Sequence, residues 1–154
     1  MRLTLALLLA LAVLSGCNQN VLLSETSAIE DGKWGYEDAF EVESALNDTL
    51  SPLNFYIEVR HGSTYPYQNL IVFFKTYFPN NTYKVDTIDC PLAEKSGRWY
   101  GTGLGDMLDN RVMFKRNVQL PQAGNYKFEL QHAMRSDTIE KIYDIGLRIE
   151  KAIN

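Results

Sequence analysis

Residues 53–60 read Leu-Asn-Phe-Tyr-Ile-Glu-Val-Arg, so that an apolar residue stands at every second position. Successive side chains of a β-strand point to opposite faces of the sheet, and this alternation therefore predicts a strand with one buried and one wet face. The next apolar run, residues 70–74, reads Leu-Ile-Val-Phe-Phe and has no polar position. Such a run predicts a central strand that is covered on both faces.

Further alternating runs follow along the chain, at 83–87, 112–118, 126–130 and 145–149. In the second of these, Arg116 either interrupts the inner face or marks a bulge. Residues with turn-forming side chains separate the runs, and a short helix or turn at 137–142 is the one departure from strands that we expect. The pattern predicts an all-β fold, an antiparallel β-sandwich of jelly-roll type that forms a single domain over residues 33–154.

The chain begins with Arg2 and a twelve-residue apolar run, Leu3–Leu14, which is too short to span a bilayer as a helix. A short positive segment followed by such a run is typical of a signal peptide. The sequence Leu14-Ser15-Gly16-Cys17 then resembles the lipobox of bacterial lipoproteins. We therefore expect cleavage of residues 1–16 and acylation of Cys17 with lipid, including palmitate. An ordinary secretory signal with a coincidental cysteine is the alternative.

Residues 17–32 are mostly polar and show no periodicity, so they are expected to form a flexible tether between the lipid and the domain. Cleavage removes Arg2 alone among the charged residues and leaves 14 basic against 19 acidic, a net charge of −5. This balance argues against a nucleic-acid partner. Once Cys17 carries lipid, Cys90 has no disulfide partner. It is expected to be a small buried hydrophobe, with a reactive thiol as the alternative.

The sequence predicts no catalytic residue, metal site or cofactor. Both histidines, His61 and His132, lack the neighbouring ligands of a zinc site and are expected to be surface or hydrogen-bonded residues. The glycines of 101–105 do not have the spacing of a phosphate-binding loop, which predicts a flexible connection between strands. Four aspartates match no calcium-loop spacing, although they could gather around an ion. These are Asp86, Asp89, Asp106 and Asp109.

Aromatic residues beside predicted turns are the strongest functional signal. Tyrosine, tryptophan and arginine are the residues that anchor protein interfaces. A candidate docking face therefore comprises Tyr65, Tyr67, Arg98, Trp99 and Tyr100. Stacking platforms for a glycan are an alternative for such rings, and rings that close the ends of a core are another. A hydrolase is disfavoured because Glu41 and Glu43 would share one strand face instead of flanking a cleft.

Several segments together resemble the GldH family, the gliding-motility lipoproteins of the Bacteroidota. They are Tyr65–Leu70, Asp86–Ile88, Gly97–Asp106, Gly124–Phe128, Gln131–Arg135 and Asp144–Ile149. The resemblance implies a non-enzymatic component of the cell envelope that supports gliding and the type IX secretion machinery, with other envelope lipoproteins or membrane proteins as partners. A glycan-binding lipoprotein for adhesion or nutrient capture is the alternative function.

The resemblance also bears on location and modification. Surface-exported lipoproteins of this phylum carry acidic residues after the cysteine, whereas residues 18–21 are neutral. We therefore expect a lipid anchor in the outer membrane, on its periplasmic face. Three tripeptides resemble the Asp-Ser/Thr-apolar acceptor of O-glycosylation in this phylum, and they contain Thr49, Thr87 and Thr138. Thr49, in a polar stretch before Pro52, is the candidate expected to be best exposed.

Overall fold

Residues 20–153, the part of the chain that the computed structural model describes, form ten β-strands and one 3-10 turn. The strands are β1 (Val21–Ala28), β2 (Lys33–Gly35), β3 (Phe40–Leu46), β4 (Leu53–Gly62), β5 (Asn69–Tyr77), β6 (Tyr83–Pro91), β7 (Met107–Val118), β8 (Gly124–His132), β9 (Thr138–Glu140) and β10 (Ile142–Lys151), with η1 at Glu30–Gly32. Within this part of the chain no helix is long and apolar enough to cross a bilayer. The predictions for residues 1–16 and Cys17 lie outside it.

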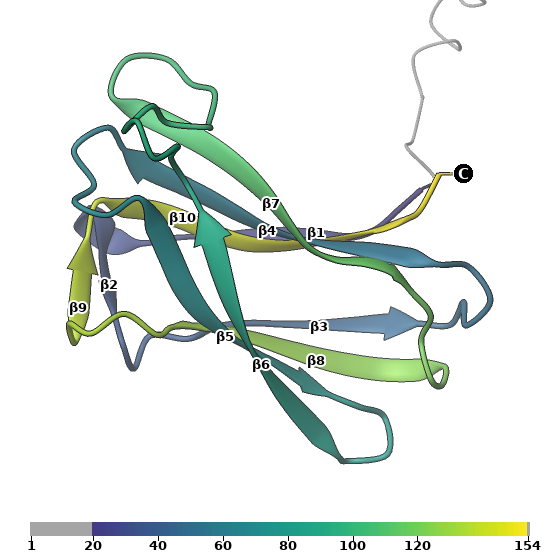
Figure 1. Ribbon diagram of the computed structural model, residues 1–154. Helices are drawn as coiled ribbons and strands as arrows, with labels where there is room; N and C mark the ends of the chain where they lie inside the picture. The colour runs from purple at the N-terminus through teal and green to yellow at the C-terminus, as the bar shows by residue number, and fades with distance from the viewer. Residues whose placement is uncertain (1–19, 154) are drawn as a thin grey trace, which may run out of the picture.

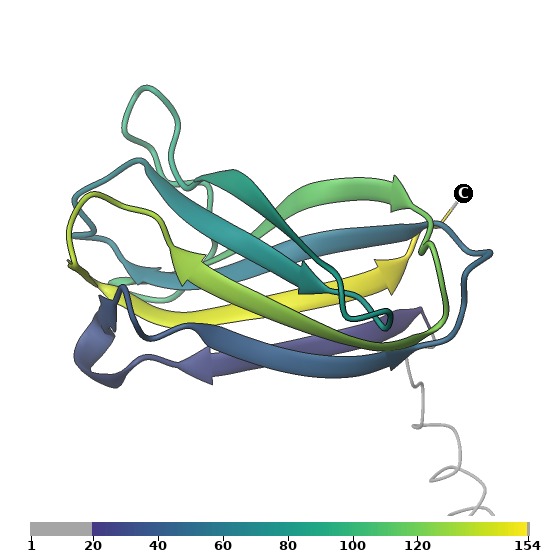
Figure 2. The same ribbon diagram turned by 90° about the horizontal axis from the view of Figure 1, so that it is seen from below.

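Two four-stranded antiparallel sheets face each other, in the orders β1-β10-β4-β7 and β3-β8-β5-β6. Figure 1 shows them as two layers, and Figure 2 shows the same layers from below. The chain crosses between the sheets after β3, β4, β6 and β7, which interleaves strands that are distant in sequence. This is the strand order of a jelly roll, so the predicted antiparallel β-sandwich is confirmed. A two-stranded ribbon, β2 with β9, closes one end.

The core lies between the two sheets and is built by the alternation seen in the sequence. In β4 the odd-numbered residues from Leu53 to Val59 are buried, while the even-numbered ones point outward. Strands β8 and β10 confirm their predicted alternation in the same way, through Phe128 and Leu147 among others. Aromatic rings from both sheets meet at the centre, where Phe74 stacks on Phe128 at 5.7 Å and meets Phe55 edge to face at 6.4 Å. Contacts of this kind add to the free energy gained by burying the rings.

The predicted flexible tether over residues 17–32 is wrong from Val21 onward. Residues Val21–Ala28 form β1, which pairs with β10 along its whole length. Leu23 is buried in the core, whereas Ser24 to Ala28 are all exposed, so this stretch of the edge strand is wet on both faces. The polar composition of this segment gave no strand signal, because the strand is stabilised by pairing with the C-terminal end of the chain.

Three smaller predictions are corrected. In β5, Leu70, Val72 and Phe74 are buried but Ile71 and Phe73 are only half-buried, because no second layer covers the outer face of this sheet. The apolar alternation at 83–87 points outward, since the pairing of Cys90 with Leu70 directs the other set of β6 residues inward. Within residues 137–142, Thr138–Glu140 form β9, where Ile139 pairs with Trp34 of β2, so no helix forms there; a turn remains at Lys141, φ 70°, before β10.

A bulge in β7 accounts for the irregular pattern around Arg116. Val118 pairs with Leu53 and Lys115 pairs with Phe55, so the pairing shifts register between them. Asn117 adopts a left-handed backbone conformation, φ 53°, and its N–H donates to the Asn54 side chain at 3.0 Å. The bulge leaves Arg116 exposed, which settles the alternatives in favour of a shifted register.

Both histidines are fully buried, so neither is a surface residue; the alternative, a hydrogen-bonded histidine, is confirmed for His61. The ring of His61 contacts Trp99 at 4.7 Å, and its Nδ1 lies 2.9 Å from the Gly62 carbonyl. The ring of His132 meets Trp34 edge to face at 5.3 Å, and neither of its nitrogens has a hydrogen-bond partner at ordinary geometry. Burial lowers the pKa of both imidazoles, an effect that nearby backbone groups partly oppose. Each ring is therefore held neutral.

Cys90 is confirmed as a small buried hydrophobe. Burial raises the pKa of its thiol to about 12. Because the thiolate is the reactive form, the structure argues against the alternative of a reactive thiol.

Removal of β1 should destabilise the whole sandwich. A chain that begins at Lys33 loses the burial of Leu23 and leaves β10 as an unpaired edge. Truncation of one buried leucine costs about 2–5 kcal/mol, and each lost backbone hydrogen bond adds about 0.5–1.5 kcal/mol. Urea unfolding of chains that begin at residues 20 and 33 measures the difference. Equal unfolding midpoints would show that residues 20–32 are a tether after all.

Stability should fall as the pH drops from 6.5 to 5. The unfolded chain binds protons at its histidines near pH 6.5, whereas the folded chain resists them, so their stabilising effect is complete above that pH and is lost below it. Each histidine contributes at most about 1.4 kcal/mol per pH unit. Carboxylates whose pKa is lowered in the folded state reduce the stability only where the unfolded chain protonates them, below about pH 4.5. Urea unfolding at pH 7.5, 6 and 5 tests this, and a flat profile contradicts it. His132→Leu, which removes no hydrogen bond, should reduce the slope.

Candidate functional site

The outer face of the β1-β10-β4-β7 sheet is a polar surface. The residues that alternate with the buried set in these four strands point outward, and antiparallel pairing places them in rows across the sheet. One row joins Asp144 of β10, Arg60 of β4 and Asp109 of β7, and the next joins Gly146, Glu58 and Arg111. The register thus puts opposite charges beside one another on neighbouring strands.

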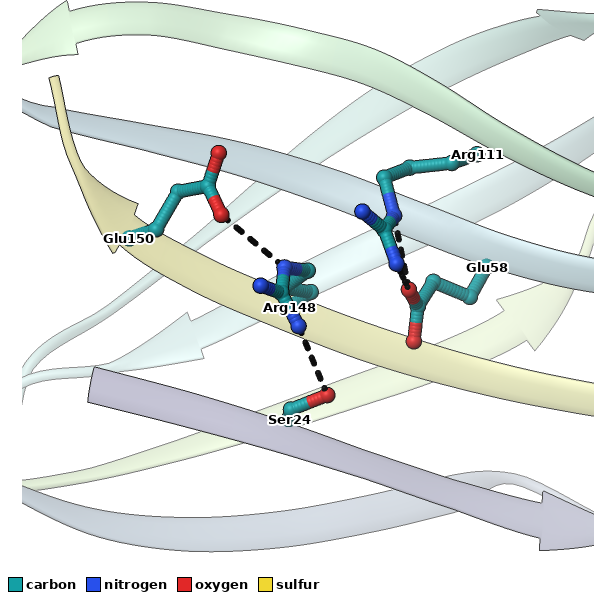
Figure 3. Close-up of polar contacts among 5 residues, drawn as sticks. All are labelled: Ser24, Glu58, Arg111, Arg148 and Glu150. Atoms are coloured by element: carbon teal, nitrogen blue, oxygen red, sulfur yellow. Dashed lines mark hydrogen bonds and ion pairs between the residues drawn. The ribbon is translucent and has the colours of Figure 1, made fainter. Parts of the chain in front are cut away.

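Ion pairs offset all but one of the charges on this face, with three arginines against four carboxylates. Arg111 donates to Glu58 Oε1 from Nε at 2.8 Å, and Arg148 donates to Glu150 at 2.9 Å and to Ser24 Oγ at 3.3 Å, as Figure 3 shows. Arg60 pairs with Asp109 at 2.7 Å and with Asp144 at 3.3 Å. Exposed pairs contribute only about 0–1 kcal/mol each to stability. Their effect here is to fix the side chains and to cancel their charges.

The pKa shifts follow these contacts. The hydrogen bond and charge of Asp109 raise the pKa of Arg60. Burial alone would raise the pKa of Glu150, but hydrogen bonds from Arg148 and Tyr56 outweigh it and lower that pKa. Burial and the neighbouring Glu150 raise the pKa of Tyr56. All of these groups therefore keep their ordinary charge states at neutral pH.

A groove of about 800 Å³ runs over this face and is bounded by the loop that joins β6 to β7. Charged side chains form its floor, and Tyr100, Gly101 and Thr102 of the loop form one wall. Two backbone hydrogen bonds of 2.8 and 3.1 Å join Thr102 to Asp109 and hold the wall against β7. A Cβ at Gly103 would overlap the Met107 carbonyl, so this glycine permits a close approach of the backbone.

The same loop is joined to the turn after β4. The N–H groups of Leu92 and Ala93 both donate to the Gln68 carbonyl, at 2.8 and 3.0 Å, and Tyr100 N–H donates to the Leu92 carbonyl at 2.9 Å. The turn at residues 63–68 and the loop at residues 92–106 thus form one end of the sandwich, which we call the loop end. The structure brings together the two segments that were predicted to form the docking face.

The five predicted docking residues divide into two groups. Tyr67 and Tyr100 are 40% and 56% exposed, and Arg98 is exposed while it pairs with Glu94. Tyr65 is only 3% exposed, because its ring packs between His61 and Tyr67 in the core, so it does not lie on the surface as expected. Trp99 is half-buried against His61. The surface at the loop end is therefore formed by Tyr67, Arg98 and Tyr100.

The charged residues of the groove did not stand out in the sequence. Glu58 and Arg60 appear there only as the wet positions of a strand. The register that aligns them with Asp109, Arg111 and Asp144, which lie 49 to 86 residues away along the chain, could not be inferred from the sequence. Alternation identifies an exposed face, but long-range pairing decides which side chains meet on it.

The remaining candidate positions lie apart from one another. Asp86 pairs with Lys84 and Lys115, Asp89 accepts from Asn69, and Asp106 accepts from Ser63. Among residues 20–153 no three such side chains gather as metal ligands would. Thr49 is half-buried in the turn between β3 and β4, whereas Thr87 and Thr138 are exposed, so the expectation that Thr49 is the best exposed acceptor is wrong.

The comparisons with known proteins agree on one family of relatives. The family described as GldH lipoprotein matches residues 21–149. A gliding motility lipoprotein GldH homolog of Christiangramia forsetii is 29% identical over 147 residues, which cover 91% of this chain and 90% of the relative. Gliding motility lipoprotein GldH of Flavobacterium johnsoniae is 26% identical over 152 residues, 94% of each chain.

Among solved structures, the VP2 subviral particle of infectious bursal disease virus matches with a TM-score of 0.31 and 14% identity, over 82% of this chain and 32% of that one. A likeness this low carries no structural argument. The match to residues 21–149 covers all of β1 and most of β10. The relatives likewise match nearly end to end, so the chain belongs to the GldH lipoprotein family.

Proposed function

We propose that this gliding-motility lipoprotein is held in the outer membrane by lipid on Cys17, on the periplasmic face, and supports the gliding and type IX secretion apparatus by docking to other envelope proteins. The observation that carries the docking proposal is the loop end. There Tyr67, Arg98 and Tyr100 are exposed on a turn and a loop that hydrogen bonds hold together, beside a groove. Rigid aromatic and arginine side chains supply contact area at a low entropic cost.

The groove favours binding over catalysis. Glu58 and Asp109 accept hydrogen bonds from guanidinium groups, so each carboxylate is already engaged in an ion pair within the protein. Both histidines are buried in the core. A partner strand or loop that enters the groove would instead meet an ordered set of donors and acceptors. We therefore propose a non-enzymatic role.

Glycan binding is a second candidate, and one observation favours it. Tyr100 stands on the wall of a groove that is floored by planar carboxylate and guanidinium groups, and sugars combine ring stacking with hydrogen bonds to such groups. Among the described residues that line the groove, Tyr100 is the one aromatic. An extended stacking platform for a glycan requires more than one ring. Docking to a protein remains the first proposal.

The variant Arg98→Ala/Tyr100→Ala should lose its partner and keep its stability. Both side chains are exposed, so truncation leaves the core intact, while interface anchors of these types are worth at least about 2 kcal/mol each, or roughly 30-fold in affinity. The measurement is a cross-linked pull-down from native membranes together with a thermal melt. Tyr83→Ala, which removes a 64% exposed ring on the other sheet, is the matched control.

Equal recovery of partners by the double variant and by the control would refute docking through the loop end. If binding to envelope polysaccharide fell instead of binding to protein, the glycan proposal would replace it. Trp99→Ala is unsuitable for this test, because its ring packs on buried His61 and its loss would lower stability first.

The variant Cys17→Ala should remain an unprocessed or unanchored precursor. Acylation requires the thiol, and stable membrane attachment requires more than one acyl chain. Fractionation of cells labelled with palmitate provides the measurement. Incorporation of label into the Cys17→Ala protein, at the level of the parent, would show that the anchor lies elsewhere.

A further inference from the structure

Both ends of the described chain lie at the end of the sandwich opposite the loop end. The Lys151 N–H donates to the Asn20 carbonyl at 2.8 Å, and the Ala152 N–H donates to the Pro52 carbonyl at 2.8 Å. Gln119 reaches the Leu50 carbonyl at 3.2 Å. We call this the terminal end, formed by residues 20–21, 48–52, 119 and 151–153. In Figure 1 it is the right-hand end, where β10 finishes and β3 turns into β4.

Two large apolar side chains project from the terminal end. Leu50 is 84% exposed and Ile153 is 83% exposed. Leu50 is held outward by an ordered turn, in which Asp48 accepts from the N–H groups of Leu50 and Ser51 and pairs with Lys151 at 2.6 Å. The carboxylate of Asp48 and the N–H groups of Leu50 and Ser51 are thereby paired within the protein. What remains is a rigid apolar projection beside the start of β1.

The distance from the lipid is fixed by the position of β1. Only residues 18 and 19 separate Cys17 from Asn20, and an extended chain spans at most about 3.6 Å per residue, so Asn20 lies within about 11 Å of the acylated residue. A tether that reached Gly32 would have allowed about 50 Å. The polar headgroup layer on each side of a bilayer is itself roughly 5–8 Å deep. Lipid on Cys17 therefore brings the terminal end to the membrane surface.

We propose that the terminal end lies on the lipid surface, with Leu50 and Ile153 in the interfacial layer, and that this contact orients the sandwich. The inference rests on the proposed lipidation of Cys17. Strand β4 runs from Leu53 at the terminal end to Gly62 near the loop end, and ten residues of strand span about 33 Å. The loop end, with its groove and exposed tyrosines, then stands about 30 Å from the membrane and faces away from it.

The test uses an environment-sensitive fluorophore on a single introduced cysteine. Leu50→Cys is compared with Leu104→Cys, a matched control because Leu104 is 94% exposed in the loop between β6 and β7. Cys90 is buried and would not react in the folded protein. The lipidated chain is purified and placed in vesicles of phosphatidylethanolamine and phosphatidylglycerol that carry spin-labelled lipid. The probe at position 50 should shift to the blue and be quenched several-fold more than the probe at position 104.

Each other outcome overturns the proposal in a distinguishable way. A protein that does not float with the vesicles shows that the lipid anchor is absent, which also removes the proposed attachment. If the protein floats with the vesicles but the probe at position 50 reports water, the oriented contact is refuted and the lipid anchor is supported. The same conclusion follows if the probes at positions 50 and 104 are quenched equally. Protection of position 50 in native membranes but not in vesicles assigns the terminal end to a protein partner instead.

Discussion

The pairing of β1 with β10 is the interaction on which the rest of the structure depends. Strand β10 lies between β1 and β4, and its inward residues, Ile145, Leu147 and Ile149, are all buried in the core. A strand in that position needs neighbours on both edges, because unpaired backbone groups beside a core are costly. Strand β1 supplies one of these two neighbours, and β4 supplies the other. Strand β1 thereby fixes both chain ends at one end of the sandwich and leaves the opposite end free for loops.

Charge has a different role on each side of the sandwich. Inside, the two imidazoles are kept neutral by burial, and they pack as aromatic rings against tryptophans. Outside, on the β1-β10-β4-β7 face, arginines pair with carboxylates, across neighbouring strands for Arg60 and Arg111 and within β10 for Arg148. A face of this kind offers many hydrogen-bonding groups but little net field, so recognition there depends on shape and on matched donors and acceptors more than on long-range attraction.

The sequence predicted the architecture because alternation is a local signal that the tertiary structure preserved. Strands β4, β8 and β10 bury the residues that their patterns single out, and a sandwich follows from several such strands. Strand β1 escaped prediction since only Leu23 among its residues is buried, so almost no periodicity remains to be read. Its existence depends on the pairing with β10, from Val21 with Glu150 to Ala28 with Asp144, which no local pattern encodes.

The candidate site was predicted in part for the same reason. Turn signals placed aromatic rings at one end of the fold, and Tyr67, Arg98 and Tyr100 are exposed there. Tyr65 lies two residues from Tyr67 and in the same turn, yet the packing against His61 buries it. Residue type and turn position do not distinguish the two tyrosines, because burial at a turn depends on which neighbouring segment folds over it. The groove depends on the register of four strands, and no local sequence pattern predicts that register.

The closure of the sheet by its first and last strands has a consequence for biogenesis. Contacts of such large sequence separation form late and make folding slow. A chain that emerges from the ribosome N-terminus first presents Val21 early and Lys151 last, so the position of β10 between β1 and β4 stays empty until almost the whole polypeptide has been made. The sandwich therefore cannot be completed piecemeal during synthesis. Its sheet closes only when the last strand becomes available.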